Sequence, residues 1–288
     1  MSKLSDSKVI KEILVRHGFH FSKSLGQNFL INPTVCPKMA KQCGVRENGG
    51  VLEIGPGIGV LTYELAQRAK KVVAVELDSR LLPVLTETLS EFDNISVIQG
   101  DILKIDLKEL LEKEFGKIPV SVCANLPYYI TSPVIMKLLE EQLPIESLTV
   151  MVQKEAAERI CAQPGMRASG AISAAVRYYA EPEILFFVSK GSFLPSPKVD
   201  SAVIRLNILK QPSVSVEEPK QFFAVIKAGF SQRRKTILNS LSAGFSIDKA
   251  QMSEILKHCL IPSTARAEQL TLEQFAAISD AITNRNEK

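Results

Sequence analysis

The chain of 288 residues is 45% hydrophobic and 23% charged, which is ordinary for a globular protein and long enough for one large domain and a smaller one. No stretch approaches the ~18 apolar residues of a membrane span, the start shows no signal-peptide pattern, and the five cysteines form no CxxC pair. These features argue against a membrane protein, a disulfide scaffold and a zinc site, and we expect a reduced, cytoplasmic protein without a metal.

The net charge of +4 is unevenly spread along the chain. Residues 1–50 hold eight basic against three acidic side chains, residues 51–209 hold sixteen against twenty, and residues 210–241 hold six against two. Basic flanks around a mildly acidic middle suit a catalytic core with arms that touch a polyanion. Solvated helix faces would give the same pattern, so charge alone leaves both interpretations open.

Strands and helices are predicted to alternate over the first two thirds of the chain. An amphipathic helix is expected over residues 5–16. Apolar strands are predicted at 51–54, 72–75, 95–98, 120–124 and 148–152, with helices over 61–69, over 81–89 and from Ser132, which is placed to cap the last of them. This βαβ order predicts a parallel sheet with helices on both faces.

The pattern changes after about residue 180. Two strands, at 183–188 and 202–208, have no crossover helix between them and predict an antiparallel hairpin at the sheet edge. Short helices are expected over 217–230, 233–241, 248–258 and 271–283. The predicted fold class is α/β: a Rossmann-like, mostly parallel sheet with an antiparallel edge hairpin over residues 1–209, which include an N-terminal helical arm, and a small all-α domain over 210–288.

A glycine-rich turn follows the first strand of the predicted sheet, in the stretch Val-Leu-Glu-Ile-Gly-Pro-Gly-Ile-Gly over residues 51–59. Gly55 and Gly57 let the backbone turn sharply and approach a ligand closely. The spacing lacks the last glycine of the dinucleotide fingerprint GxGxxG, and Pro56 removes a backbone N–H that a phosphate could use. A nucleotide without a pyrophosphate fits this loop better than NAD does.

Two carboxylates stand at the ends of the next two strands. Glu76 lies 21 residues after Gly55, where an acidic side chain can accept both hydroxyls of a ribose. Asp101 ends the third strand, where it can meet the amino group of an adenine. Because ligands bind at the carboxyl ends of such strands, the loop and the two carboxylates together predict S-adenosylmethionine as the cofactor.

The fourth strand ends in Asn125-Leu126-Pro127-Tyr128. The exocyclic amine of adenine is a poor nucleophile, because its lone pair is delocalised into the ring. The side-chain oxygen of Asn125 and the backbone carbonyl of Leu126 can each accept one amine hydrogen, which returns the lone pair to nitrogen. Tyr128 offers a face for an extruded base. The same four residues could also form a plain strand-ending turn with a buried tyrosine.

Five motifs resemble those of the ribosomal RNA adenine dimethyltransferase family, in its bacterial small-subunit branch. The motifs read GQNFL at 26–30, EIGPGIG at 53–59, NLPY at 125–128, FLPSPKVDS at 193–201 and FSQRRKT at 230–236, and the resemblance extends over nearly the whole length of the chain. The second and third motifs alone would also admit the macrolide-resistance methyltransferases. Together the five motifs are highly specific.

The resemblance implies a cofactor site, a reaction and a partner. The S-adenosylmethionine contacts would fall on Asn28, Leu30, Gly55, Glu76, Asp101 and Asn125, with Gly57 in the same loop. The reaction would be N6,N6-dimethylation of two adjacent adenosines in a hairpin near the 3′ end of small-subunit ribosomal RNA. The substrate would be an immature small subunit, and the enzyme a monomer. Asn28 and Leu30 rest on the resemblance alone.

Further RNA contacts are expected at two places. The family's loop that begins at Phe193 lies beside the target pocket, and Phe193 could be a core residue or a second stacking surface, of which we favour the second. Arg233, Arg234 and Lys235 are expected at the start of a helix, where they would reach phosphates without base specificity.

Three alternatives stay open at this stage. The chain could be a large-subunit adenine methyltransferase of the macrolide-resistance type, although residues 195–201 and the helical tail favour the small-subunit branch. It could act mainly as a ribosome-assembly factor, for which binding matters more than catalysis. A dehydrogenase is disfavoured by the missing glycine and by the lack of a hydride-site His or Tyr–Lys pair.

Overall fold

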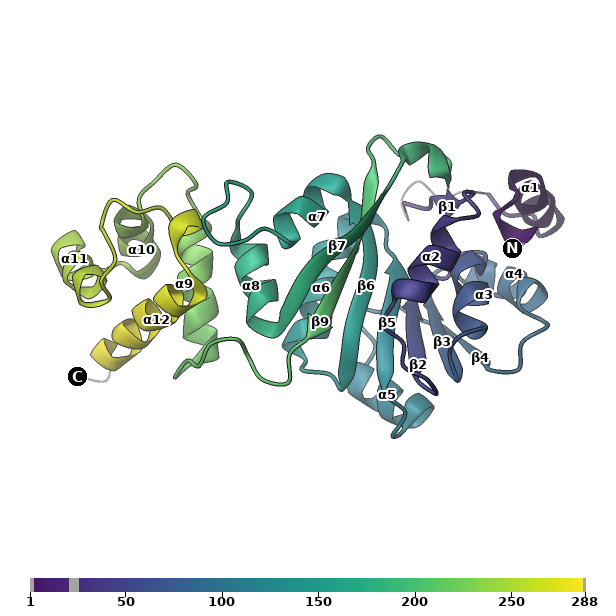
Figure 1. Cartoon of the computed structure of the whole chain (residues 1–288), viewed down its shortest axis with the longest axis horizontal. Coiled ribbons are helices and arrows are strands. Elements are labelled where there is room, and N and C mark those ends of the chain that lie inside the picture. Colours follow the sequence, from purple (N-terminus) through teal and green to yellow (C-terminus); the bar gives the residue numbers. More distant parts are fainter. Residues whose placement is uncertain (1–2, 21–25, 287–288) are drawn as a thin grey trace. The chain divides into compact units, whose positions relative to one another are not determined.

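The computed structural model of the chain describes residues 3–20 and 26–286 (Figure 1). The chain divides into two compact units. The first runs to Ala157 and resumes over Glu183–Ile208, and the second takes Glu158–Pro182 and the described chain from Leu209 onward. The sequence suggested a boundary at residue 209, and the structure differs in grouping residues 158–182 with the C-terminal helices.

A seven-stranded sheet forms the centre of the first unit (Figure 1). Its strands are β2 (Gly50–Ile54), β3 (Lys71–Glu76), β4 (Ile95–Gln99), β5 (Val120–Asn125), β6 (Ile145–Gln153), β7 (Ala180–Val188) and β9 (Ser201–Ile208), in the order β4-β3-β2-β5-β6-β9-β7. The strands from β4 to β6 pair in parallel, and β9 is antiparallel to β6. The predicted mostly parallel sheet with an antiparallel edge is confirmed.

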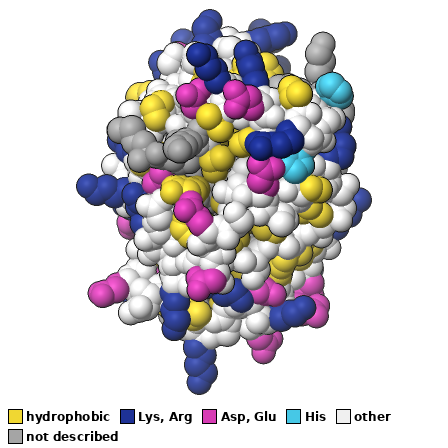
Figure 2. All heavy atoms as spheres, turned by 90° about the vertical axis from the view of Figure 1, so that its right-hand side faces the viewer, with side chains coloured by type: hydrophobic (Ala, Val, Ile, Leu, Met, Phe, Trp, Pro, Cys, Tyr) yellow, Lys and Arg dark blue, Asp and Glu magenta, His cyan; other side chains and the backbone are white. Residues whose placement is uncertain are grey.

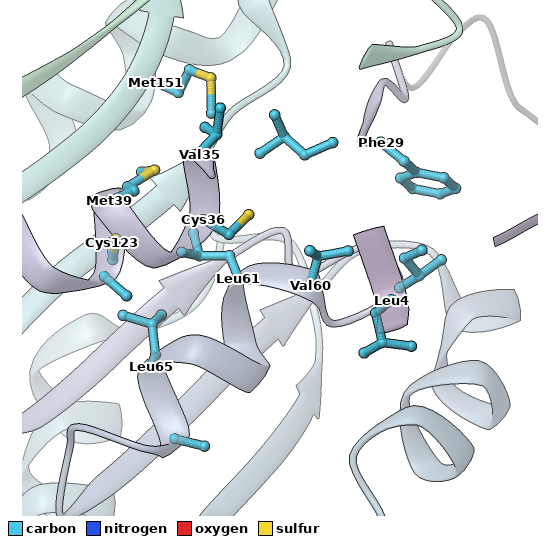
Figure 3. Close-up of a cluster of buried hydrophobic side chains, with 14 of the residues drawn as sticks. Leu4, Phe29, Val35, Cys36, Met39, Val60, Leu61, Leu65, Cys123 and Met151 are labelled. Carbon is cyan, nitrogen blue, oxygen red and sulfur yellow. The ribbon is translucent and has the colours of Figure 1, made fainter. Parts of the chain in front are cut away.

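Helices cover both faces of this sheet (Figure 1). They are α1 (Ser7–Arg16), α2 (Val35–Gln42), α3 (Val60–Ala66), α4 (Leu82–Thr88), α5 (Leu107–Phe115), α6 (Thr131–Glu140) and α7 (Lys154–Ile160). One apolar core joins α1, α2 and α3 to the strands through side chains such as Met39, Leu61, Cys123 and Met151 (Figure 3). The prediction that Ser132 caps α6 is wrong, because the helix begins at Thr131 without a side-chain cap.

The strand order creates a crevice at the carboxyl edge of the sheet. From β2 the chain proceeds to β3 and β4 on one side, and then returns to β5 on the other side of β2. The loops after β2 and β5 therefore leave in opposite directions, which is the arrangement that opens a ligand site in α/β sheets. Ile54 lies opposite both Val75 and Ala124, so the ends of all three strands meet at this edge.

Two short strands and a helix pair complete the first unit. β1 (Phe29–Leu30) and β8 (Phe193–Leu194) pair antiparallel, which brings the GQNFL motif to the FLPSPKVDS motif. Arg16 at the end of α1 forms an ion pair of 2.9 Å with Glu87 of α4, and Nε2 of the adjacent His17 lies 2.6 Å from the same carboxylate. Acidic and basic side chains mix on that face of the unit (Figure 2), so part of the N-terminal positive charge is compensated within the chain.

The second unit is helical, as predicted for the C-terminal region. It contains α8 (Ala171–Tyr179), α9 (Pro219–Phe230), α10 (Ile237–Phe245), α11 (Lys249–His258) and α12 (Leu272–Asn286). Side chains at Glu218, Thr236 and Asp248 cap α9, α10 and α11 by accepting backbone N–H groups. Tyr178 packs on Phe222, with 5.0 Å between ring centroids, and so joins α8 to the helical core.

Short 3₁₀ turns occupy five further places in the described part of the chain. They span Lys3–Ser5, Ser79–Leu81, Tyr128–Ile130, Lys190–Ser192 and Ala267–Gln269. The turn over Tyr128–Ile130 begins three residues after the end of β5 at Asn125 and leads into α6. Among the described residues no helix is long and apolar enough to span a membrane.

Candidate active site

A single cavity brings together the ends of four neighbouring strands. It encloses about 1100 Å³ of space, a figure that includes solvent at its open mouth. Its walls contain every residue that the sequence suggested for the cofactor and the target base: Asn28, Leu30, Gly55, Gly57, Glu76, Asp101, Asn125, Leu126 and Tyr128. The structure therefore brings these residues together at the carboxyl edge of the sheet, as the sequence predicted.

The glycine loop forms the floor between β2 and α3. Gly55 and Gly57 have φ angles of +69° and +61°, which side-chain-bearing residues rarely adopt. A Cβ at Gly55 would meet no atom within 4 Å, so the backbone there borders open space that a ligand can fill. A Cβ at Gly57 would instead come 3.1 Å from the ring of Phe29, so this glycine also lets the N-terminal segment pack closely.

Glu76 is held by the backbone around it. Its Oε2 accepts the N–H of Gly57 at 3.1 Å, and its Oε1 accepts the N–H of Asp78 at 2.9 Å. Its pKa is raised because the carboxyl is buried, although the two N–H donors act in the opposite direction. Each oxygen keeps further acceptor capacity, so the carboxylate can also accept the two ribose hydroxyls in a preset orientation.

Asp101 is more open than Glu76. Its Oδ1 accepts the backbone N–H of Leu103 at 3.0 Å, and its Oδ2 lies 3.8 Å from Nζ of Lys104. The ion pair that Oδ2 forms with Lys104 is long and exposed, and therefore weak. It can accept the amino group of an adenine placed across the strand ends, as the sequence predicted.

The N-terminal segment closes the cavity from the side of β3. Asn28 donates from Nδ2 to the carbonyl oxygen of Gly26 at 3.0 Å, and Gln27 donates from Nε2 to Oδ2 of Asp78 at 2.9 Å. Arg80 contacts the same carboxylate at 2.6 Å and lowers the pKa of Asp78. Leu30 is buried in β1, so its place in the wall comes from the β1–β8 pair.

The Asn125–Tyr128 segment forms the opposite wall. Asn125 is the last residue of β5, opposite Met151 of β6. Pro127 has φ −55° and ψ 133°, an extended conformation between the strand and the 3₁₀ turn. The hydroxyl of Tyr128 lies 2.8 Å from Oγ of Ser201, and burial raises the pKa of this tyrosine. The half-buried ring is thus anchored at its far end, while the side chain of Leu126 is buried.

The two other groups of predicted RNA contacts lie in different surroundings. Phe193 is only 3% exposed and belongs to the apolar core, although it also lines the cavity. A base could reach it only from inside the cavity. Arg233, Arg234 and Lys235 are exposed in the turn between α9 and α10, and not at the start of a helix, because α10 begins at Ile237. Arg233 donates to the carbonyl oxygen of Arg167 at 2.7 Å in the same unit.

The sequence reasoning overlooked Glu53 as a cavity residue. Its side chain is 1% exposed, lines the cavity and has no hydrogen-bond partner at Oε2 among the described residues. Burial raises its pKa to about 8, and the charge of Glu76 adds to this effect. The available signal was a carboxylate inside an otherwise apolar strand, directly before the glycine loop. No cluster of metal-ligating side chains occurs in the described part of the chain.

A Rossmann-like sheet whose carboxyl edge joins a glycine loop, a buried carboxylate at the end of β3 and an Asn-Leu-Pro-Tyr segment is the arrangement expected of a nucleic-acid adenine methyltransferase. Residues 18–284 match the family described as ribosomal RNA adenine dimethylase, and the chain belongs to this family. It is accordingly an rRNA methyltransferase that uses S-adenosylmethionine, and the open space beside Gly55 and the free acceptors of Glu76 fit that cofactor.

Relatives and solved structures agree with this assignment. The chain is 46% identical to the ribosomal RNA small subunit methyltransferase A of Alkaliphilus oremlandii, over 99% of this chain and 100% of the relative. It is 49% identical to the protein of that name from Bacillus licheniformis, over 94% of each. The crystal structures of a dimethyladenosine transferase from Plasmodium falciparum and of the 23S rRNA methyltransferase ErmE superpose with TM-scores of 0.73 and 0.68, each at 27% identity, covering 90% and 88% of this chain and 98% and 99% of those chains.

Proposed function

We propose that this protein dimethylates the N6 amines of two adjacent adenosines in a hairpin near the 3′ end of small-subunit ribosomal RNA. We further propose that it acts as a monomer on an immature small subunit. Sequence identity supports the small subunit as the target, because relatives with that name share 46–49% of their residues with this chain over nearly its full length. The large-subunit enzyme ErmE shares 27%.

One observation carries the proposal: Asn125, Leu126 and Tyr128 line the same cavity as Gly55 and Glu76. The groups that can activate an adenine amine thus open onto the space that holds the methyl donor. When bound, S-adenosylmethionine supplies an electrophilic methyl group. The residues suited to hold it are Asn28, Leu30, Gly55, Gly57, Glu76, Asp101 and Asn125.

The chemical work of the protein is mainly positioning. The extruded adenine stacks on Tyr128, whose ring cannot swing freely because Ser201 holds its hydroxyl. The amide oxygen of Asn125 and the carbonyl of Leu126 accept the two amine hydrogens, so the nitrogen becomes more nucleophilic. No strong general base is required, since the methylated ammonium is acidic enough to release its proton to water.

Binding of the RNA is assigned to charge outside the cavity. Arg233, Arg234 and Lys235 are exposed in one turn of the second unit, where they can contact phosphates without reading bases. Phe193 can contact the RNA only through a base that has entered the cavity. In this proposal the basic side chains provide affinity for the RNA, and the cavity provides the methyl-transfer reaction.

The direct test is incubation of the protein with labelled S-adenosylmethionine and small subunits that lack the modification. Primer extension then locates the label in the RNA. Two adjacent dimethylated adenosines near the 3′ end of the small-subunit RNA are expected. Label in large-subunit RNA only would establish the macrolide-resistance type of activity instead. Tight binding of the particle without methyl transfer would make the protein an assembly factor.

A further inference from the structure

An exposed phenylalanine stands beside a lysine at the end of β7. The ring of Phe187 is 58% exposed, and Nζ of Lys154, the first residue of α7, lies 5.3 Å from the ring centroid. The preceding residue, Phe186, points the other way, as alternation along a strand requires, and it packs against the apolar core. Phe186 therefore has a structural role, whereas the large apolar surface of Phe187 remains in contact with water.

This pair is linked to the target site by a short series of contacts. Lys154 donates its backbone N–H to the carbonyl oxygen of Asp200 at 3.0 Å. The next residue, Ser201, holds the hydroxyl of Tyr128 at 2.8 Å and lies opposite Gln153 of β6. The ends of β6, β9 and β7 stand one strand spacing apart, so the step from β6 to β7 is roughly 10 Å. Two or three stacked nucleotides, at about 3.4 Å each, span such a distance.

The charge at this end of the sheet suits a polyanion. Lys190 and Lys198 are exposed on the segment between β7 and β9, as Lys154 is at the start of α7. Asp200 is the acidic residue of that segment, and its Oδ1 already accepts the backbone N–H of Lys190 at 2.9 Å. An exposed aromatic ring with a lysine beside it and further lysines on the neighbouring segment is a combination that suits single-stranded nucleic acid, with a base on the ring and phosphates on the cations.

We propose that Phe187 and Lys154 form a platform for a nucleotide that flanks the target adenosine in the RNA. The platform would hold the neighbouring base while the target base enters the cavity at Tyr128. This proposal rests on the proposed function, because that function puts RNA at Tyr128. It adds a contact that orients the strand, so it concerns binding of the RNA and not the transfer of the methyl group.

Kinetics on small subunits that lack the modification test this platform. Phe187→Ala should raise KM for the particle by roughly 5- to 100-fold, the cost of one lost base stack, and leave the single-turnover rate at saturating particle nearly unchanged. Phe187→Tyr should restore the parental KM. Lys154→Ala should lower the log–log salt slope of binding by about 0.7, as for one phosphate contact on single-stranded nucleic acid. Val97→Ala is the matched control, because Val97 is an exposed apolar residue on β4, at the opposite edge of the sheet.

A photoreactive phenylalanine analogue at position 187 identifies the partner directly. Crosslinks to nucleotides next to the methylated adenosines support the platform. Crosslinks to a ribosomal protein, or to a second copy of this chain, overturn it. If the parent enzyme methylates the particle and Phe187→Ala behaves like Val97→Ala, the platform is wrong while the proposed function stands. If the parent enzyme methylates no small-subunit RNA, the function fails on its own evidence.

Discussion

The cavity and the basic turn of the second unit are built on opposite principles. In the cavity two of the predicted site residues are fixed by other parts of the fold: two backbone N–H groups hold Glu76, and Ser201 holds Tyr128. In the turn, Arg233, Arg234 and Lys235 project from the surface, where Arg233 donates one hydrogen bond to the carbonyl oxygen of Arg167. A single substitution of a group that acts through its position should therefore cause a large loss of activity. Substitutions of groups that act through their charge should each cause a small loss of RNA binding, and these losses should add.

Asn125→Ala should produce the largest effect and is the strongest test of this contrast. The substitution removes one amine acceptor but keeps Tyr128 and the carbonyl of Leu126. The single-turnover methyl-transfer rate at saturating S-adenosylmethionine should fall by at least about 100-fold, on the order of 3 kcal/mol. RNA affinity should change little, because charge outside the cavity dominates it.

Two further variants sharpen the result for Asn125. Asn125→Asp keeps an acceptor of the same shape but adds a negative charge beside the cationic donor. Asn207→Ala removes an amide of β9 that contacts Glu183 and lies outside the cavity, so it should retain full activity. If both variants at position 125 transfer methyl groups at the parental rate, the proposed activation of the amine is wrong, and the segment is only a strand-ending turn.

Glu76→Ala should weaken S-adenosylmethionine binding by at least about tenfold, since each hydrogen bond to a charged acceptor contributes roughly 1.5–3 kcal/mol. Titration calorimetry measures this loss. The variant also leaves the N–H groups of Gly57 and Asp78 without their acceptor, so its thermal stability has to be recorded alongside. Glu114→Ala is the control, because Glu114 is a mostly buried glutamate paired with Lys71 outside the cavity. Unchanged cofactor affinity in folded Glu76→Ala would remove this residue from the site.

Glu53 makes the stability of the cavity depend on pH. Its folded-state pKa of about 8 lies above the ordinary value of 4.5, so the folded protein holds this proton more tightly than the unfolded chain does. The stability that this group contributes is full below about pH 4.5 and is lost as the pH rises through about 8. Glu53→Gln keeps the shape without the titration.

Melting curves of the two proteins without cofactor test this difference. Between pH 5 and pH 9 the parent should lose about 4 kcal/mol, or ~8–16 °C in Tm, relative to Glu53→Gln. The raised pKa of Glu76 acts in the same direction, but it is present in both proteins and cancels in the comparison. Parallel Tm curves across this pH range would show that Glu53 does not titrate there.

The parts of the fold that the sequence predicted share a physical cause. Runs such as Val51–Ile54 and Val120–Ala124 are buried on both faces and end in polar or glycine residues, so strands and strand ends could be placed from composition alone. Because the ends of these strands meet at one edge of the sheet, the residues that come after them could be predicted to line a common cavity. Glu53 was missed for the same reason, since it occupies an ordinary position inside a strand.

Contacts between distant segments could not be read in this way. The β1–β8 pair joins two-residue strands that lie about 160 positions apart and have no periodicity of their own. Pairing with Glu87 gives Arg16 and His17 an intramolecular role that net charge alone concealed. Burial of Phe193 likewise depends on β1, so its place in the core could not be inferred from the loop in which it stands.

Arg233→Ala with Arg234→Ala should give the smallest and most additive effect. Each lost phosphate contact lowers the log–log salt slope of RNA binding by about 0.7–0.9, so the double variant should lose at most roughly twice that amount. The hydrogen bond from Arg233 to Arg167 uses one N–H, and the guanidinium keeps others for a phosphate. Affinity for free S-adenosylmethionine should not change, because neither arginine lines the cavity. Lys249→Ala with Lys257→Ala is the matched control, since it removes two exposed charges from α11 of the same unit. Equal slopes for both double variants would mean that the turn at 233–235 is a solvated face, and the contrast between position and charge would then need another cationic surface in this chain.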